Sequence, residues 1–118
     1  MENITQNKGI LIIAIVNRGS SDLVMDAARR KGARGGTLFH AHGTGNVEIE
    51  KYFGVPIQPE KEMLFIIVDP KIKDDVLLEI YKDAGLDSKG QGIVFSVELD
   101  DVIGLTPIDD NNLNKEDK

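Results

Sequence analysis

Residues 10–16, ILIIAIV, form the longest continuous apolar run in the chain, and they decide its fold class. The run is rich in β-branched residues and is far too short to cross a bilayer, so it predicts a strand that is covered on both faces. Residues 63–68, MLFIIV, repeat the pattern. Two strands of this kind predict a central sheet with both of its faces buried.

Each of these strands is followed by a helix signal. After the first, Ser20 or Ser21 is expected to cap a helix that stops at Gly32. After the second, Asp69 is the expected cap and Pro70 the first helical residue. The predicted buried positions are Leu23, Val24, Ala27 and Ala28 in the first helix, and Ile72, Val76, Leu77, Ile80 and Ala84 in the second.

The remaining strands are expected at residues 37–42 and 93–99, with a long loop without clear periodicity at residues 43–58. The resulting order predicts an α+β, ferredoxin-like βαββαβ sheet with two helices on one face. The chain has no spare element to cover the second face of its apolar strands. We therefore expect other copies of the chain to cover it, in a homo-oligomer.

Composition narrows the class of protein. The chain has 118 residues, no cysteine and a formal net charge of -6. These values predict a single domain over residues 1–118, with a core at 9–105, the loop at 43–58 and a polar tail at 106–118. The absence of disulfides and of a signal-peptide pattern favours the cytoplasm, and the negative charge argues against nucleic acid or an anionic membrane as partner.

Two glycine segments, Gly43-Thr44-Gly45 and Gly90-Gln91-Gly92, occupy matching places in the two halves of the chain. Glycines beside a small polar residue let several backbone N–H groups converge on an anion, although a simple turn is the alternative. If subunits meet along their sheets, one segment can approach the other across the interface. The basic cluster at residues 29–31 is explained by electrostatics at a helix C-terminus.

Two other kinds of site are open from the residues alone. His40 and His42 are expected on one face of a strand and could hold a metal, but no third ligand is evident nearby in sequence. Asn17 and Arg18 could serve a small phosphatase, yet no activated nucleophile or carboxylate pair accompanies them. A non-enzymatic binding protein is therefore the first expectation, with an enzyme or a histidine-based metal module as alternatives.

The sequence resembles the PII signal-transduction proteins over about residues 10–105. The resemblance rests on Gly32, Gly35 and Thr37, on Gly43-x-Gly45, and on residues 90–95, GQGIVF. It implies a trimeric ferredoxin-like sensor that binds adenine nucleotides between subunits and acts through a flexible T-loop. Regulation of a partner such as a membrane transporter or a metabolic enzyme is the implied function.

The resemblance also implies site residues. Ile15, Thr37 and the strand around 65–67 would border the adenine, and the backbone of the two glycine segments would hold the phosphates. The segments concerned are Gly43, Thr44 and Gly45, with Gly90, Gln91, Gly92 and Ile93 across the interface. The T-loop would present Glu48, Lys51, Tyr52 and Phe53 to a partner.

The chain departs from the family pattern in its cations. Ile93 replaces a signature lysine, and Gly104 and Thr106 stand where family members carry arginines. Each lost charge-assisted contact to phosphate is worth about 1.5–3 kcal/mol. The expected ligand is thus ADP, ATP or AMP, with the less charged nucleotides easier to bind unless other cations substitute. The candidate substitutes are Arg18, Arg34 and Lys89.

Overall fold

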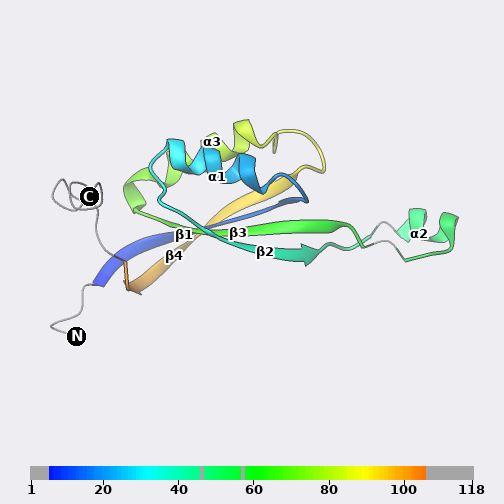
Figure 1. Cartoon of the computed structure of the whole chain (residues 1–118), viewed down its shortest axis with the longest axis horizontal. Coiled ribbons are helices and arrows are strands. Elements are labelled where there is room, and N and C mark those ends of the chain that lie inside the picture. Colours follow the sequence, from blue (N-terminus) through cyan, green and yellow to red (C-terminus); the bar gives the residue numbers. More distant parts are fainter. Residues whose placement is uncertain (1–5, 46, 57, 106–118) are drawn as a thin grey trace, which may run out of the picture.

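A computed structural model describes residues 6–45, 47–56 and 58–105 of the chain. The expected tail, Thr106 included, lies outside the described residues. The elements follow in the order β1 (Gln6–Asn17), α1 (Ser21–Arg30), β2 (Thr37–His42), α2 (Val47–Phe53), β3 (Glu60–Val68), the 3-10 turn η1 (Pro70–Ile72), α3 (Lys73–Asp83) and β4 (Gly92–Ile103). The expected α+β architecture is confirmed (Figure 1).

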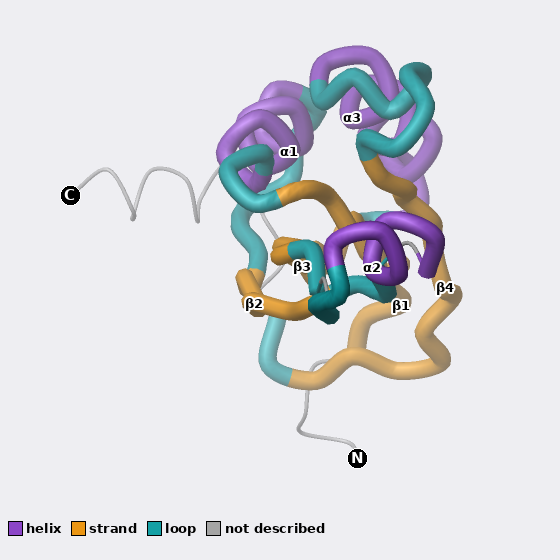
Figure 2. Tube along the Cα trace, turned by 90° about the vertical axis from the view of Figure 1, so that its right-hand side faces the viewer, coloured by secondary structure: helices purple, strands orange, loops and turns teal. Residues whose placement is uncertain are grey.

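The strands form one antiparallel sheet in the order β2-β3-β1-β4. The two doubly apolar strands lie at its centre, where their register pairs Ile13 of β1 with Phe65 of β3. Helices α1 and α3 cover one face as a second layer, as Figure 2 shows end-on. This is the arrangement that the order of strands and helices predicted.

The core lies between the helices and the sheet. In β1 the even-numbered residues from Ile10 to Val16 are buried, and in β3 Leu64, Ile66 and Val68 are buried with them. Val24, Ala27 and Ala28 of α1 and Val76 and Ile80 of α3 pack onto these residues. Leu23 was also expected among the buried residues of α1, but it is 50% exposed. The buried face of this helix is therefore narrower than predicted.

The opposite face of the sheet, which we call the open face, has no helix over it among the described elements (Figure 1). Directly paired residues point to the same side of a sheet, so the register assigns its members. They are almost all apolar and partly exposed: Leu11, Ile13, Ile15, Phe39, Met63, Phe65, Ile67, Ile93, Phe95 and Val97. Phe39 and Phe65 form an edge-to-face aromatic pair, with ring centroids 4.9 Å apart.

Two elements differ from expectation. Residues 43–58 contain a helix, α2, so three α-helices rather than two are present in the described part of the chain. This helix lies beyond the end of the sheet, far from α1 and α3 (Figure 1). β4 continues to Ile103, beyond the strand expected at residues 93–99, and Val102 is buried in the register position opposite Asn7. Long-range pairing with β1 extends a strand whose local apolar alternation ends at Leu99.

Candidate functional site

One end of the sheet gathers most of the chemically interesting residues. Because β1 and β2 run toward this end while β3 and β4 begin there, Asn17, Gly43, Lys61 and Gly92 come from four different strands or their ends. The β2–β3 pair continues outward from here and carries α2 at its tip (Figure 1). We call residues 43–59, from Gly43 to Pro59, the arm.

Polar contacts connect the two central strands with the glycine turn before β4. The ammonium Nζ of Lys61 donates to Oδ1 of Asn17 at 2.6 Å. Nδ2 of Asn17 donates in turn to the carbonyl oxygen of Gly90 at 3.2 Å. Lys61 was not predicted as a site residue, because its partner lies 44 positions away in the chain.

The residues expected around an adenine share the open face. Ile15 pairs directly with Ile93 on one side and with Met63 on the other. Thr37 pairs with Phe65 at the start of β2. Met63, Ile15 and Ile93 are direct neighbours on three adjacent strands, so their side chains form a continuous apolar floor that ends near the Gly90 turn.

The two glycine segments differ in backbone geometry. Gly90 and Gly92 have positive φ angles of 81° and 140°, as a curled turn requires. Gly43 does not, and its N–H donates to the carbonyl oxygen of Pro59 at 2.8 Å, which extends the β2–β3 pairing. In the single chain the N–H of Gly43 is therefore already used within the arm. Within one chain, β2 and β4 are at opposite edges of the sheet, about 14 Å apart.

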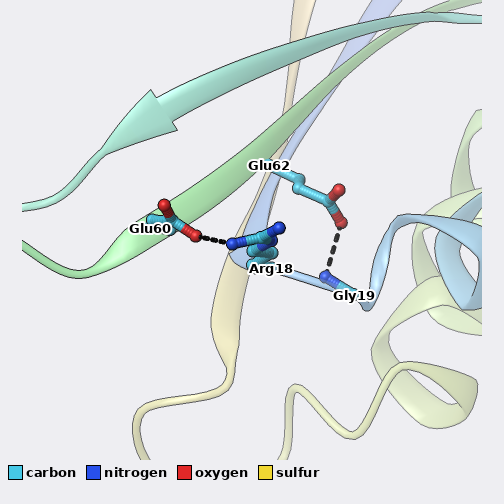
Figure 3. Close-up of polar contacts among 4 residues, drawn as sticks. All are labelled: Arg18, Gly19, Glu60 and Glu62. Atoms are coloured by element: carbon cyan, nitrogen blue, oxygen red, sulfur yellow. Dashed lines mark hydrogen bonds and ion pairs between the residues drawn. The ribbon is translucent and has the colours of Figure 1, made fainter.

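The candidate cations lie in different places. Arg18 follows β1 and forms an ion pair with Glu60 at the start of β3 (Figure 3). Lys89 is exposed in the turn beside Gly90. Arg34 precedes β2 and is therefore at the opposite end of that strand from Gly43. Arg30, from the basic cluster, binds Glu79 and Asp83 of α3, so it joins the two helices.

His40 and His42 lie on the helix side of β2, opposite Glu62 and Glu60. Both histidines line an open hollow of about 210 Å³. Its other lining residues are Arg18, Ala41, Glu60 and Lys61. The described residues include no group of three or more His, Asp or Glu placed to hold a metal ion. The positive charges of Arg18 and Lys61 also disfavour a cation here.

Glu62 takes over a role that the sequence assigned to a serine. Ser20 is the N-cap residue of α1, but its side chain makes no capping hydrogen bond. Instead, Oε1 of Glu62 accepts from the backbone N–H group of Gly19 at 2.8 Å (Figure 3) and from that of Ser21 at 3.2 Å. A carboxylate from β3 thus occupies the N-terminus of α1, where the helix dipole favours negative charge.

Glu62 is 7% exposed, and among the described residues it is the one buried charged side chain. Burial by itself would raise the pKa of this carboxyl, but the hydrogen bonds from Gly19 and Ser21 and the nearby His40 outweigh burial and lower the pKa below its ordinary value of 4.5. A lowered folded-state pKa stabilises the fold at pH values above the unfolded-state pKa. That contribution is lost as the pH falls through the folded-state pKa.

The variant Glu62→Gln tests this role. Its amide oxygen still accepts a hydrogen bond, but the charge is gone, so we expect a loss of about 1–2 kcal/mol in the free energy of unfolding at pH 7. The difference from wild type should shrink as the pH falls from the ordinary value of 4.5 through the lower folded-state pKa. Urea unfolding at several pH values measures both. A difference that is constant from pH 7 to pH 3 would contradict a charged cap.

The tip of the arm is markedly apolar for an exposed segment. None of the seven residues of α2 is buried, and Tyr52 and Phe53 are 83% and 65% exposed with their rings in edge-to-face contact. Glu48 and Lys51 lie on the same helix. Of the helices in the described ranges, none has the length and apolar character needed to span a membrane.

A sheet of this order, a helical layer on one face and an arm from the β2–β3 connection together define a class of small regulatory proteins. The family model for the nitrogen regulatory protein P-II matches residues 10–107. The chain therefore belongs to the nitrogen regulatory protein P-II family, and the expected family is confirmed. Proteins of this family are regulatory, form trimers, and bind small effectors and protein targets.

Among solved structures, the fold is similar to the crystal structure of Arabidopsis thaliana PII bound to citrate. The TM-score is 0.59 and the sequence identity 21%, over 75% of this chain and 72% of that chain. At this identity the likeness supports the fold alone. A comparison with curated protein sequences finds no match.

Proposed function

We propose that this chain is a non-enzymatic PII-type sensor that forms a homotrimer, binds ADP, ATP or AMP in clefts between subunits, and regulates a protein partner through its arm. In this proposal residues 1–118 form one domain that acts in the cytoplasm. The open face of the sheet is the observation that carries the proposal. Its apolar surface ends at a glycine turn and at the base of the arm. One interface between subunits would therefore account for the trimer, for the nucleotide site and for the effect of the nucleotide on the arm.

The open face supports assembly into a homo-oligomer, and the family favours three copies. Ile93, Phe95 and Val97 of the edge strand are 57%, 39% and 44% exposed in the single chain, and Phe39 at the other edge is 42% exposed. Such a contiguous apolar surface is rarely left in contact with water. Closed symmetric association of identical chains is the simplest way to bury it.

The nucleotide is placed between the sheets of neighbouring subunits. Ile15 and Ile93 are proposed as the apolar floor for the adenine, and Thr37, on the opposite edge strand, as a contact from a neighbouring subunit. The turn at Gly90, Gln91 and Gly92 would lie beside the phosphates. Gly43, Thr44 and Gly45 come from the adjacent subunit, which removes the distance that separates the two segments in one chain. Citrate in the Arabidopsis protein supports a small polyanion as ligand of this fold.

Charge decides which nucleotide binds well. Ile93 brings no charge to the site. Lys61, bonded to Asn17, and Lys89, beside Gly90 in the sequence, are the cations close to the Gly90 turn, whereas Arg18 is paired with Glu60 and Arg34 lies at the far end of β2. Few cations cannot fully compensate a triphosphate. We therefore expect ADP to bind at least as tightly as ATP.

The partner site is the tip of the arm. Tyr52 and Phe53 offer a large exposed aromatic surface, and Glu48 and Lys51 add charges at its rim. Aromatic residues of this kind dominate the binding energy of protein interfaces. A transporter or enzyme with an apolar recess is the type of partner that fits, and the nucleotide would act by favouring one state of the arm.

Isothermal titration of the protein with ADP, ATP and AMP tests the nucleotide proposal. We expect binding of ADP in the micromolar range, about -8 kcal/mol, with ATP no tighter than ADP. A thermal shift assay with the same ligands provides a second readout. The nucleotide proposal fails if none of the three produces heat or a thermal shift.

A further inference from the structure

We propose that Asn17 is a positioning residue that couples the Gly90 turn to the arm. The inference deepens the proposed function and rests on it, because it states how occupancy of the nucleotide site reaches the partner site. It is carried by the two hydrogen bonds of one side chain. The first goes to Gly90, 73 positions away in the sequence, and the second comes from Lys61, 44 positions away.

The chemistry of these partners requires an amide at position 17. A lysine ammonium can only donate a hydrogen bond, and a backbone carbonyl can only accept one. Asparagine offers one acceptor and two donors on a short side chain, so it satisfies both at 2.6 Å and 3.2 Å. Aspartate would keep the bond from Lys61 and lose the bond to Gly90. Leucine of similar size would lose both.

Lys61 continues the connection into the arm. Its Cε lies where a side chain at Gly43 would be, because a Cβ built on Gly43 would be 3.2 Å from that atom. The stem of Lys61 therefore packs over the first residue of the arm, whose N–H is bonded to the last one, Pro59. Lys61 itself pairs with Ala41 at the end of β2. Both strands that carry the arm are thus in contact with this one side chain.

The order of contacts is continuous. It leads from the carbonyl of Gly90 through the amide of Asn17 and the ammonium of Lys61 to the backbone of Gly43. The Asn17 contacts are at the margin of the sheet, one partly buried and one exposed, so they can break without unfolding the core. A ligand that reorients the Gly90 turn changes the position of Asn17 and, through Lys61, the base of the arm.

Hydrogen exchange measured by mass spectrometry tests this coupling, with and without saturating ADP. In the wild-type protein we expect ADP to change the exchange rate of amides in the arm about tenfold. In Asn17→Leu and Asn17→Asp that ADP-dependent change should fall to less than about twofold, while titration still shows ADP bound. A purely structural role would lower stability and leave the ADP-dependent change intact.

Lys61→Met breaks the second half of the connection and provides an independent variant should Asn17→Leu fail to fold. At ADP concentrations that titration shows to saturate this variant, it should lose the ADP-dependent change as well. Lys73→Met is the matched control, because it removes a lysine on α3 whose recorded ion pair is with the neighbouring Asp74. This control should keep the full tenfold change.

The outcomes separate the two levels of the proposal. No heat with ADP in the wild type removes the nucleotide site, and the coupling with it. Binding of ADP without any change in arm exchange leaves the nucleotide site standing and overturns the coupling. A full ADP-dependent change in Asn17→Leu or Lys61→Met likewise overturns it, because the arm would then respond without these contacts.

Discussion

Phe95→Asp should convert the protein from trimers into monomers. Phe95 lies on the open face, opposite Ile13 of the central strand β1, and is 39% exposed in the single chain. In the proposed trimer the change removes about 1 kcal/mol of apolar burial per subunit, because only the exposed 39% of Phe95 remains to be buried, and it buries a carboxylate at a further cost of several kcal/mol. Association should weaken by about a thousandfold or more.

Sedimentation or light scattering across a range of protein concentrations measures this effect. Leu78→Asp is the matched control, because Leu78 on α3 is 51% exposed on the helical side of the molecule. It introduces the same charge away from the open face, so its assembly should equal that of wild type. Circular dichroism shows whether each variant keeps its fold. Assembly of Phe95→Asp unchanged from wild type would rule out the open face as the interface.

Phe95→Asp also tests whether the nucleotide site is shared between subunits. If the cleft is shared between subunits, a monomer presents only half of it. We expect the folded Phe95→Asp monomer to bind ADP at least a hundredfold more weakly than the wild type, whereas Leu78→Asp binds normally. Full affinity in the monomer would place the nucleotide within one subunit.

Gly92→Ala should be the most destabilising conservative substitution at the site. The φ angle of Gly92 is 140°, in a region that L-residues avoid, and a Cβ there would lie 2.4 Å from the carbonyl oxygen of Ile15. Because that atom belongs to the central strand, it cannot move without disturbing the pairing of β1 with β4. We expect the free energy of unfolding to fall by about 3–4 kcal/mol.

Gly90→Ala is the comparison that separates two causes of instability in Gly92→Ala, the clash of the new Cβ with Ile15 and the positive φ angle. Gly90 has a positive φ of 81°, but no atom lies within 4 Å of a Cβ built there. Gly90→Ala should therefore lower the free energy of unfolding by only about 1 kcal/mol. Urea unfolding of the two variants gives the comparison. Equal losses at the two positions would contradict the proposed clash with Ile15.

Several features of the site were predictable from the sequence because their signals are local. The apolar runs around Ile15 and Phe65 marked the central strands, and the Gly90 segment marked a turn with left-handed residues. Asp69 was expected to begin the second helix, and its side chain does accept a hydrogen bond from the N–H of Lys71 at 2.8 Å. Alternation and capping residues act over a few positions, so they can be read in order along the chain.

The helix in the arm was missed for a physical reason. Val47–Phe53 has only seven residues, fewer than an isolated helix needs to be stable in water, and a helical period cannot be recognised over two turns. The hydrogen bond of Gly43 was missed for a different reason. Its N–H is taken by Pro59, 16 positions later, which no local pattern announces.

By itself, the sequence determined the central strands, the helices that cover them and the surplus of apolar surface on the sheet, since burial of periodic apolar residues follows from composition and spacing. Tertiary structure alone decided that Glu62 caps α1, that Arg18 binds Glu60, and that Asn17 joins Lys61 to Gly90. Each of those contacts links residues at least 41 positions apart. Polar partners at such separations are chosen by strand register and strand order, and those exist only once the sheet has formed.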